Sequence, residues 1–492
     1  MADSLKILLV SAEVMPFAKT GGLADVAGSL PKALRTQGND VRVVLPRYKQ
    51  IEKGKYVTDF PVNMHGRKAT TIIREGEITA KEESIEDRLP VYFIDNYHYF
   101  YREGIYGYRD EAERFAFFCK AVLEMLPMIN FQPDIIHCND WQSGPIPLLL
   151  RVNYSANPFY DKIATLFTVH NLQYQGNFSR EVLHHLDLGD EFYHPEELEF
   201  YGFVSYMKAG ILYGDILNTV SRTYAQEIMT PERGERFDGL LRKRSKDLYG
   251  IVNGINYHEF NPATDPKIYK NYDSKHIKDK KRNKEKLQEE IGLPKKDVPL
   301  IGVISRLVSQ KGFDLVAGMM DELMEQDIQI VILGTGEEYY ENLIKRMKGK
   351  HPDKVGFYLG FNADLAKRIY AGCDIFLMPS RFEPCGLGQL ISLRYGTIPV
   401  VRHTGGLADT IEDYNSHKET GNGFAFTEYS SKALASAMIR ALKVYNEEPE
   451  EWLKLVKRAM DIDNSWARSA EEYRDLYQVA IRKSLTKRRM IS

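Results

Sequence analysis

Residues 6–45 have the sequence KILLVSAEVMPFAKTGGLADVAGSLPKALRTQGNDVRVVL, which has the pattern of a strand, a loop, a helix and a second strand. Leu5–Val10 is a continuous apolar run of strand length, and Val41–Leu45 is another. Between them, Leu23–Gln37 carries apolar residues at helical spacing, although Pro31 inside it predicts a kink or a break. Continuous apolar strands are typical of a sheet covered on both faces, so this segment predicts the βαβ opening of an α/β domain.

The same pattern returns in the second half of the chain. The apolar runs Pro299–Ile304 and Ile328–Leu333 are each followed by a glycine-containing loop, and Ile375–Met378 and Ile398–Val401 also have strand length. We therefore predict two α/β halves, followed by helices from Ser431 onward. The length of 492 residues fits two or three domains of roughly 100–200 residues each.

The composition, with 43% hydrophobic and 27% charged residues, is that of an ordinary globular protein. A formal net charge of -2 gives no sign of a nucleic-acid partner. The four cysteines, Cys119, Cys138, Cys373 and Cys385, form no CxxC pair and suit thiols in a reducing cytosol. The first apolar run stops before Glu13, which is too short for a signal peptide or a membrane span. We therefore predict a cytoplasmic protein with no nucleic-acid and no membrane partner.

The segment TGGLAD occurs twice, as Thr20–Asp25 and as Thr404–Asp409, and each copy follows a strand and opens a helix. We interpret the two copies as the same structural device used once in each half. Lys19 precedes the first copy. Glycines let backbone N–H groups approach an anion, the helix start adds a positive dipole end, and Lys19 adds a full charge. The first copy therefore predicts either a phosphate site or an ordinary glycine-rich turn.

Residues 305–312, SRLVSQKG, form a second charged loop after a predicted strand. Open α/β sheets bind ligands at the carboxyl ends of their strands. The guanidinium of Arg306 and the ammonium of Lys311 suit a diphosphate, and the alternative is a pair of solvated charges.

Residues 381–389, RFEPCGLGQ, form a third loop, which leads into a helix. Glu383 can bind sugar hydroxyls, and the amides of Gly386–Gly388 can meet a phosphate. We expect Cys385 to be a small packing residue, because no histidine stands beside it in the sequence to activate it.

Seven segments, taken in order, resemble the bacterial glycogen/starch synthase family. They are KTGGLADV at 19–26, TVHN at 168–171, YGFVSYMKAGI at 201–211, VNG at 252–254, SRLVSQKG at 305–312, SRFEPCGLGQL at 380–390 and RYGTIPVVRHTGGLAD at 394–409. Each segment is moderately specific for the family, whereas the ordered set is highly specific.

The resemblance implies the GT-B glycosyltransferase fold, an α/β fold with two Rossmann-like domains facing across a cleft. It implies an acceptor-side catalytic domain at residues 1–255, a nucleotide-sugar-binding domain at 256–475 and a C-terminal helix at 476–492 that crosses back to the first domain. The implied activity is that of a hexosyltransferase, which adds glucose from ADP-glucose to the non-reducing end of an α-1,4-glucan such as glycogen or a maltooligosaccharide, with retention. A UDP-glucose-dependent glucan synthase and a glucan-binding paralogue without catalysis stay as alternatives.

The resemblance also implies roles for individual residues. Those implied to be catalytic are Glu383, Arg306, Lys311 and Gln142. Those implied to bind substrate are Lys19, Gly22, Asn253, His170, Cys385, Gly386, Leu387, Gly388 and Tyr395. In this assignment Arg306 and Lys311 hold the diphosphate, and Glu383 contacts the donor glucose. Lys19 and Gly22 contact the donor phosphates, and Tyr395 lies near the nucleotide base.

Three positions depart from related sequences. Gln142 stands where the family often has histidine after Asp-Trp; it donates and accepts hydrogen bonds but does not titrate. We therefore predict that Gln142 contacts sugar hydroxyls and transfers no proton. Gly388 replaces a threonine, which removes a hydroxyl near the phosphates. Ile391 stands where many nucleotide-sugar transferases carry a second glutamate.

Departure of a nucleoside diphosphate from the anomeric carbon builds negative charge on the phosphates, which positioned cations stabilise. Lys19, Arg306 and Lys311 suit this task, so we expect neither a metal nor a cofactor. The DxD segment Asp461–Asp463 lies far in the sequence from the other motifs. No residue stands out as a nucleophile, so we hypothesise attack from the same face as departure, with the leaving phosphate helping to take the acceptor proton.

Two other activities fit parts of the sequence. A nicotinamide dehydrogenase is suggested by Rossmann-like halves and by Gly334–Gly336, but the first βα loop is KTGG and not GxGxxG. A glucan phosphorylase shares the expected fold but needs a lysine that holds pyridoxal phosphate.

Overall fold

The structure is a computed structural model that describes residues 4–78 and 88–489. Residues 1–3, 79–87 and 490–492 lie outside the described part, and they include the outer ends of the first and last predicted segments.

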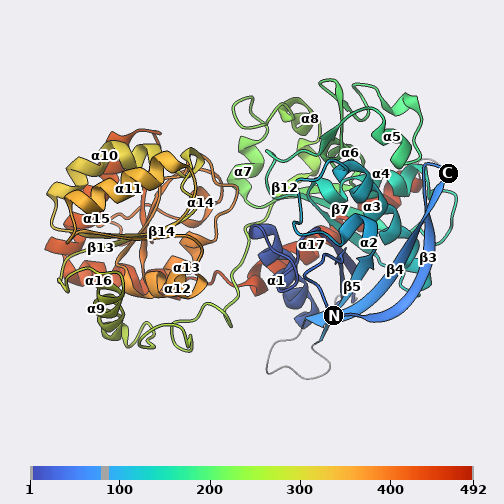
Figure 1. Ribbon diagram of the computed structural model, residues 1–492. Coiled ribbons are helices and arrows are strands. Elements are labelled where there is room, and N and C mark those ends of the chain that lie inside the picture. The colour runs from blue at the N-terminus through green and yellow to red at the C-terminus, as the bar shows by residue number, and fades with distance from the viewer. Residues whose placement is uncertain (1–3, 79–87, 490–492) are drawn as a thin grey trace. The chain divides into compact units, whose positions relative to one another are not determined.

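Two compact units make up the chain (Figure 1). The first contains the chain up to Val220, then Ala225–Asn253, and then the chain from Trp466 on. The second contains Ser221–Tyr224 and Gly254–Ser465. The last helix, α17 (Trp466–Arg489), is therefore part of the first unit, and it begins before the expected position 476.

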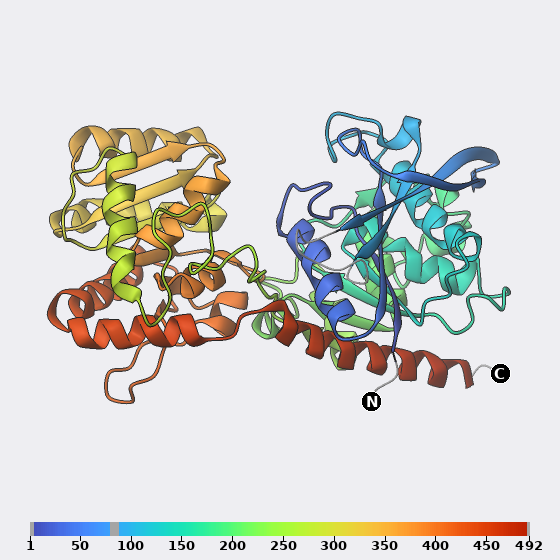
Figure 2. The same cartoon turned by 90° about the horizontal axis from the view of Figure 1, so that it is seen from below.

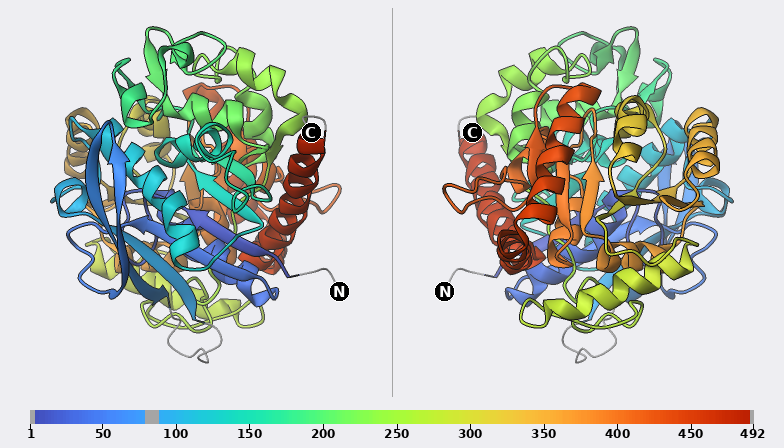
Figure 3. Two further views of the ribbon diagram at one scale, coloured as in Figure 1. Left: turned by 90° about the vertical axis from the view of Figure 1, so that its right-hand side faces the viewer. Right: turned by 90° about the vertical axis from the view of Figure 1, so that its left-hand side faces the viewer.

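The first unit is built on a sheet with the strand order β12-β11-β7-β6-β1-β2-β5-β4-β3. Strands β12 to β5 in this order run parallel to one another, whereas β4 pairs antiparallel with both β5 and β3. The two long strands β3 and β4 end the sheet on one side, as the left view of Figure 3 shows. The bounds of these strands are β1 (Lys6–Val10), β2 (Asp40–Pro46), β3 (Lys55–Met64), β4 (Arg67–Ile78), β5 (Leu89–Asp95), β6 (Ile135–Asn139), β7 (Ala164–Val169), β11 (Ile216–Thr219) and β12 (Leu248–Gly250).

A second, small antiparallel sheet in this unit has the order β8-β10-β9. Its strands are β8 (Asn177–Phe178), β9 (Glu199–Phe200) and β10 (Phe203–Ser205). The helices are α1 (Gly22–Thr36), α2 (Tyr97–Phe100), α3 (Glu111–Met128), α4 (Pro145–Val152), α5 (Val182–His185), α6 (Tyr206–Tyr213), α8 (Asp238–Lys243) and α17, with α7 (Arg222–Glu227) at a boundary between the units in the chain. Figure 2 shows α1 and α17 side by side along this unit.

Helix α1 continues without a break through Pro31, so the predicted break does not occur. The apolar side of the helix, which includes Val26, Leu30 and Leu34, is fully buried. This packing holds the helix together at the position where proline removes a backbone hydrogen bond.

A buried polar network ties α17 to the sheet. The ring nitrogens of His137 on β6 lie 2.9 Å from the Tyr477 hydroxyl and 2.7 Å from Thr168 Oγ1. The side-chain amide of Asn218 donates to the Tyr473 hydroxyl at 3.1 Å. Burial lowers the pKa of His137 to about 3, so the ring is neutral in the folded protein.

We expect the first unit to lose stability as the pH falls from about 6.5 toward 3. The folded pKa of His137 lies below its unfolded value, so only the unfolded chain takes up a proton in this window. This histidine should contribute roughly 1.4 kcal/mol per pH unit. Urea unfolding at pH 7, 6 and 5 measures the slope, which should be smaller for His137→Asn; equal slopes would contradict the assignment.

The second unit is a parallel sheet with the order β15-β14-β13-β16-β17-β18. Its strands are β13 (Leu300–Ile304), β14 (Gln329–Gly334), β15 (Val355–Leu359), β16 (Ile375–Met378), β17 (Ile398–Arg402) and β18 (Phe424–Phe426). The helices are α9 (Lys280–Glu290), α10 (Phe313–Glu325), α11 (Glu338–Lys350), α12 (Ala363–Gly372), α13 (Gly388–Arg394), α14 (Gly405–Thr410), α15 (Ser431–Glu447) and α16 (Pro449–Asp461). Figure 1 shows α10 and α11 over one face of the sheet and α12 and α13 over the other, and the right view of Figure 3 shows the same layers from the side.

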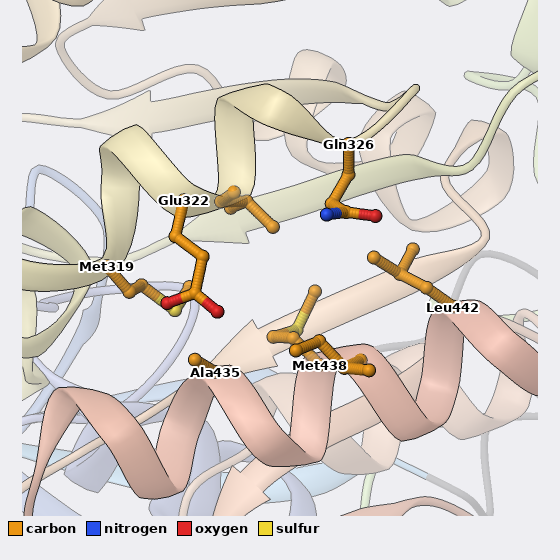
Figure 4. A pocket seen from close by; sticks show the side chains of 8 residues that line it. Met319, Glu322, Gln326, Ala435, Met438 and Leu442 are labelled. Carbon is orange, nitrogen blue, oxygen red and sulfur yellow. The ribbon is translucent and has the colours of Figure 1, made fainter.

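Helices α10 and α15 pack against each other with a small gap between them (Figure 4). Figure 4 shows Met319 on α10 opposite Met438 and Leu442 on α15, and Leu323 also lines the gap. The enclosed volume is about 10 Å³, which is no more than the space of one water molecule. The gap is therefore a packing feature and not a ligand site.

Candidate active site

In the first unit, β2 lies on one side of β1 and β6 lies on the other. The order of the strands therefore reverses between β1 and β6, and open α/β sheets bind ligands beyond the carboxyl ends of the strands at such a point. Five predicted residues follow the carboxyl ends of β1, β6, β7 and β12, namely Lys19, Gly22, Gln142, His170 and Asn253. The structure brings these five residues to one edge of one sheet.

The loop after β1 is shaped by Glu13, which is buried. Its carboxylate accepts hydrogen bonds from the backbone N–H of Thr20, from Thr20 Oγ1 at 2.7 Å, from Gly21 N at 3.1 Å and from the Tyr106 hydroxyl at 2.9 Å. At the surface, Lys19 Nζ lies 2.7 Å from Asp25. The buried carboxylate of Glu13 thus holds the loop in place, while the ammonium group of Lys19 stays accessible and can exchange Asp25 for a phosphate.

Gln142 and Asn253 are buried, with exposed fractions of 5% and 7%. Among the described residues, Gln142 Oε1 and Asn253 Oδ1 have no hydrogen-bond partner. A buried acceptor without a donor costs roughly 1–3 kcal/mol. Both oxygens therefore suit the hydroxyl groups of a ligand.

His170 follows β7 and is partly exposed. Its Nε2 lies 2.8 Å from Asn139 Oδ1, and Asn139 uses its NH₂ group to donate to Val10 O at 3.1 Å. This network assigns the proton of His170 to Nε2 and leaves Nδ1 as an acceptor. Burial lowers the pKa of His170 to about 3, so the ring is neutral at physiological pH.

Asp140 has an unusual backbone conformation, with φ 56° and ψ -178°. This region is essentially restricted to glycine and costs roughly 1–3 kcal/mol for other residues, and such strain gathers at functional sites. The Asp140 carboxylate accepts a hydrogen bond from the backbone N–H of His170 at 2.7 Å. Burial raises the pKa of Asp140 to about 7. The residue holds the His170 segment beside Gln142.

In the second unit, β14 and β16 lie on opposite sides of β13, so the strand order reverses there as well. Arg306 and Lys311 follow β13, and Glu383 and Cys385 follow β16. A pocket of about 170 Å³ opens at this point. Its lining combines predicted site residues with apolar side chains, among them Lys311, Glu383, Gly386, Leu387, Gly388, Phe313, Val316 and Leu377.

Lys311 and Glu383 form an ion pair in this pocket, with Nζ 2.6 Å from Oε2. Ser380 Oγ donates to the same carboxylate oxygen at 3.0 Å. The Glu383 side chain is only 9% exposed and that of Lys311 is 19% exposed, so solvent screens the pair weakly. Arg306 is exposed and makes a long contact of 3.4 Å with Gln310 Oε1. The guanidinium of Arg306 is therefore open to an anion, whereas Lys311 lines the pocket beside Glu383.

Close packing positions the loop that carries Lys311 and the loop that carries Glu383. Gly312 has φ 76°, and a Cβ atom on it would lie 2.0 Å from Pro379 O. Only glycine therefore lets the Lys311 loop pack against the end of β16. On the other loop, Gln389 Nε2 donates to Cys385 O and Gly386 O, both at 3.0 Å.

The two TGGLAD copies differ in their surroundings. Gly21 and Gly22 are exposed, with nothing within 4 Å of an added Cβ. Gly405 and Gly406 are buried, and added Cβ atoms would lie 2.0 Å from Glu383 O and 2.1 Å from Cys385 O. Each copy does start a helix, but the interpretation that both copies form the same structural device is otherwise wrong. The second copy packs against the Glu383 loop, because β17 lies next to β16.

Tyr395 requires a second correction. Its side chain is fully buried, and its hydroxyl donates to Asp265 Oδ2 at 2.5 Å. A ring without exposed surface cannot contact a nucleotide base, so the role predicted for this side chain is wrong. The position at the end of α13 places the ring in the core of the second unit.

Sequence reasoning missed three residues of the site, namely Glu13, Asp140 and Ser380. Each is a polar residue within three positions of the end of a predicted or observed parallel strand. That placement is the signal by which they could have been found, since the carboxyl ends of such strands meet at the ligand-binding edge.

Within the described ranges, no three His, Cys, Asp or Glu side chains are grouped so as to hold a metal ion, and Asp461 and Asp463 belong to these ranges. All four cysteines are also in the described part, where each is buried as a thiol. No helix among the described residues combines the length and the apolar character needed to cross a membrane.

Two family models match the chain. The model of the starch synthase catalytic domain matches residues 6–243, and the model of glycosyl transferases group 1 matches residues 283–458. The two matches fall largely in the first and in the second unit, respectively.

Curated relatives match the chain over nearly its whole length. A glycogen synthase of Desulforudis audaxviator is 62% identical, with 97% of each chain covered, and one of Moorella thermoacetica is 60% identical, with 98% of each covered. The catalytic domain of starch synthase IV from Arabidopsis thaliana, solved with ADP and acarbose bound, is 34% identical with a TM-score of 0.87, and the match covers 97% of this chain and all of that one.

Proposed function

The chain belongs to the glycogen and starch synthase family of glycosyltransferases, and on that premise we propose that it transfers glucose from ADP-glucose to the non-reducing end of an α-1,4-glucan, with retention. The products are ADP and a glucan one glucose unit longer. The observation that carries the proposal is the Lys311–Glu383 pair in a pocket at the strand-order reversal of the second unit.

We assign the donor diphosphate to Lys311 and Arg306. As the bond between the anomeric carbon and the phosphate oxygen breaks, charge grows on the diphosphate, and cations already in position stabilise it without reorganising. The diphosphate competes with Glu383 for Lys311 Nζ. Glu383, released from that contact, then accepts hydrogen bonds from the glucose hydroxyls.

We assign sugar and acceptor contacts to the polar groups of the first unit. Gln142 Oε1 and Asn253 Oδ1 are buried acceptors that suit sugar hydroxyls, and His170 Nδ1 is a third. Lys19 adds a cation for the donor phosphates. None of the three acceptor groups carries a proton that is easily transferred, since two are amides and the histidine is neutral.

Retention follows if the acceptor 4-hydroxyl attacks from the face that the diphosphate leaves. The new C1–O4 bond then forms on that face, and the hydroxyl proton passes to the departing phosphate oxygen. Trapping a covalent glucosyl-enzyme would contradict this route.

The deciding experiment measures nucleoside diphosphate released from ADP-glucose and, separately, from UDP-glucose, with and without glycogen. The variants are Lys19→Ala, Glu383→Ala and Gln142→Ala. We expect glycogen-dependent ADP release that is lost in the first two variants and reduced in the third. Full activity of Gln142→Ala would contradict the role of that residue.

The other outcomes of this experiment distinguish the alternative activities. A preference for UDP-glucose would keep the reaction and change the donor. Release from neither donor, with glycogen still bound, would favour a glucan-binding paralogue without catalysis.

We expect Asp140→Gly to lower kcat/KM for ADP-glucose about 10²-fold, because the His170 segment loses its anchor and small displacements in a site are costly. The unfolding midpoint should stay the same or rise, because glycine relieves the strain at φ 56°. Asn130→Gly is the matched control, since Asn130 is exposed with φ 50° in the same unit. Unchanged activity of Asp140→Gly, or an equal loss in the control, would contradict the assignment.

A further inference from the structure

The proposed function gives no role to a cluster of three side chains in the second unit, namely Tyr429, Arg381 and Arg402. Tyr429 stands between β18 and α15, Arg381 follows β16, and Arg402 ends β17. Arg381 Cζ lies 4.7 Å from the centre of the Tyr429 ring, and Arg402 Cζ lies 5.3 Å from it. A guanidinium at such a distance is attracted by the charge distribution of an aromatic ring. The Tyr429 ring therefore holds two cations together that would otherwise repel each other.

The Tyr429 hydroxyl contacts the segment that carries Lys311. It donates to Asp314 Oδ1 at 2.6 Å, with Ser309 O as a more distant acceptor at 3.3 Å. Arg381 Nη2 lies 3.3 Å from the other oxygen of the same carboxylate. Ser309 begins the short turn that contains Lys311, and Asp314 stands in the first turn of α10. The hydroxyl thus contacts the chain on either side of Lys311.

The two arginines connect the Glu383 loop to the same segment. Arg402 Nη1 donates to Arg381 O at 2.6 Å, and the backbone N–H of Arg381 donates to Gln310 O at 2.9 Å. Arg381 stands two residues before Glu383 in the chain, and Gln310 directly precedes Lys311. The cluster therefore joins the two loops close to both members of the ion pair.

The position of this cluster matters when the ion pair opens. In the proposed function the diphosphate takes Lys311 Nζ away from Glu383, so the contact that joins the two side chains is lost as the donor binds. The contacts of Tyr429 involve neither of these side chains, and they persist when the pair opens. A displacement of about 1 Å in a site can cost about 10²-fold in rate, so the spacing of the two loops must be kept in the loaded pocket.

We infer that Tyr429 is a positioning residue for the donor. Its ring and its hydroxyl keep Lys311 and Glu383 at the spacing that the diphosphate and the glucose of a nucleotide-sugar require. Tyr429 acts through the two loops and not by contact with the donor. The inference rests on the proposed function for the identity of the donor, and it implies that changes at Tyr429 affect the donor and not the glucan.

The test uses the full chain with the variants Tyr429→Ala and Tyr429→Phe. Calorimetry measures the affinity for ADP, and ADP release measures the kinetics. Tyr429→Ala should weaken ADP binding about 3–10-fold, and it should lower kcat/KM for ADP-glucose about 10–100-fold, because small displacements of site groups are costly. Tyr429→Phe should lose only about 2–5-fold in kcat/KM, because it keeps the ring contacts and lacks one hydrogen bond. The KM for glycogen should change less than twofold in both variants.

The double variant Tyr429→Ala/Lys311→Ala separates positioning from a loss of folded protein. If Tyr429 acts through the Lys311 segment, the double variant should retain the kcat/KM of Lys311→Ala within about threefold, because residues that act as a unit are not additive. A variant that only lowers the folded fraction would lose the same factor in both backgrounds. Thermal unfolding of each variant measures the folded fraction directly.

Tyr269→Ala is the matched control. Tyr269 is 39% exposed in the same unit, its hydroxyl donates to the Glu290 carboxylate on α9, and Arg368 Cζ on α12 lies 5.8 Å from its ring. It thus makes the same kinds of contact with α9 and α12 in place of the two loops, and its replacement should leave ADP affinity and activity unchanged.

Three results would overturn the inference and leave the proposed function standing. They are unchanged ADP affinity and activity in Tyr429→Ala, an equal loss in Tyr269→Ala, and a fully additive loss in the double variant. Weaker ADP binding in Tyr429→Ala, in a chain whose unaltered form releases ADP from neither donor, would support the positioning role and overturn the proposed function.

Discussion

Replacing Lys311 with alanine is expected to lower kcat/KM for ADP-glucose by about 10²–10³-fold, the usual effect of removing one preorganised group that stabilises transition-state charge. The ammonium lies in a pocket at the carboxyl ends of β13 and β16 and is only 19% exposed, so water replaces it poorly. The loss should appear mainly in kcat, because the charge on the diphosphate grows as the bond breaks. Steady-state kinetics with saturating glycogen measures it.

Two further variants sharpen the Lys311 experiment. Lys311→Arg keeps the charge but changes its shape, so it should recover part of the lost activity. Lys295→Ala removes an exposed lysine of the same unit and should leave activity unchanged. A loss below tenfold in Lys311→Ala, or a change confined to KM, would show that Lys311 contributes binding and not transition-state stabilisation.

The sequence predicts six of the parallel strands well, namely β1, β2, β13, β14, β16 and β17. The runs Leu5–Val10 and Val41–Leu45 match β1 and β2 within one residue at either end, because strands buried on both faces are continuously apolar. The antiparallel strands β3 and β4 at one end of the sheet went unpredicted, as did the remaining parallel strands. Their residues alternate between exposed and buried, and their pairing depends on the tertiary position at the edge of the sheet.

The candidate site could likewise be predicted from the sequence only in part. Charged residues in the loops that follow strands, such as Lys311 after β13, are predictable because the topology places these loops at the ligand-binding edge. Glu13 is different, since its role depends on Tyr106, which lies 93 residues away in the chain. Tyr395 shows the opposite error: it lies in a recognisable motif, but the packing of α13 turns its ring into the core.

The surroundings of Tyr395 contain a buried cation that organises the second unit. Lys280 Nζ lies within hydrogen-bond distance of five oxygens. They are Tyr272 Oη, Tyr370 O, Ala371 O, Tyr395 O and Thr397 Oγ1. Three of these are carbonyls at the C-terminal ends of α12 and α13, where a positive charge is favourable. Helix α13 begins at Gly388, so this cation also holds the helix that follows the Glu383 loop.

Lys280→Met is accordingly expected to destabilise the second unit by about 1–3 kcal/mol, because it keeps the length of the side chain but removes a buried donor that five oxygens share. Tyr272 Oη, which donates to Tyr395 O at 2.7 Å, and Thr397 Oγ1, which donates to Tyr370 O, remain as donors. At roughly 2–4 °C per kcal/mol for a unit of this size, the thermal unfolding midpoint should fall by about 2–12 °C. Lys281→Met is the matched control: it lies on the same helix, pairs only at the surface with Asp297 at 2.9 Å, and should leave the midpoint unchanged. A fall of less than 2 °C in Lys280→Met would mean that other protein groups satisfy these carbonyls. Water is not an alternative donor, because the burial that lowers the pKa of Lys280 to about 7 also excludes water from the carbonyls.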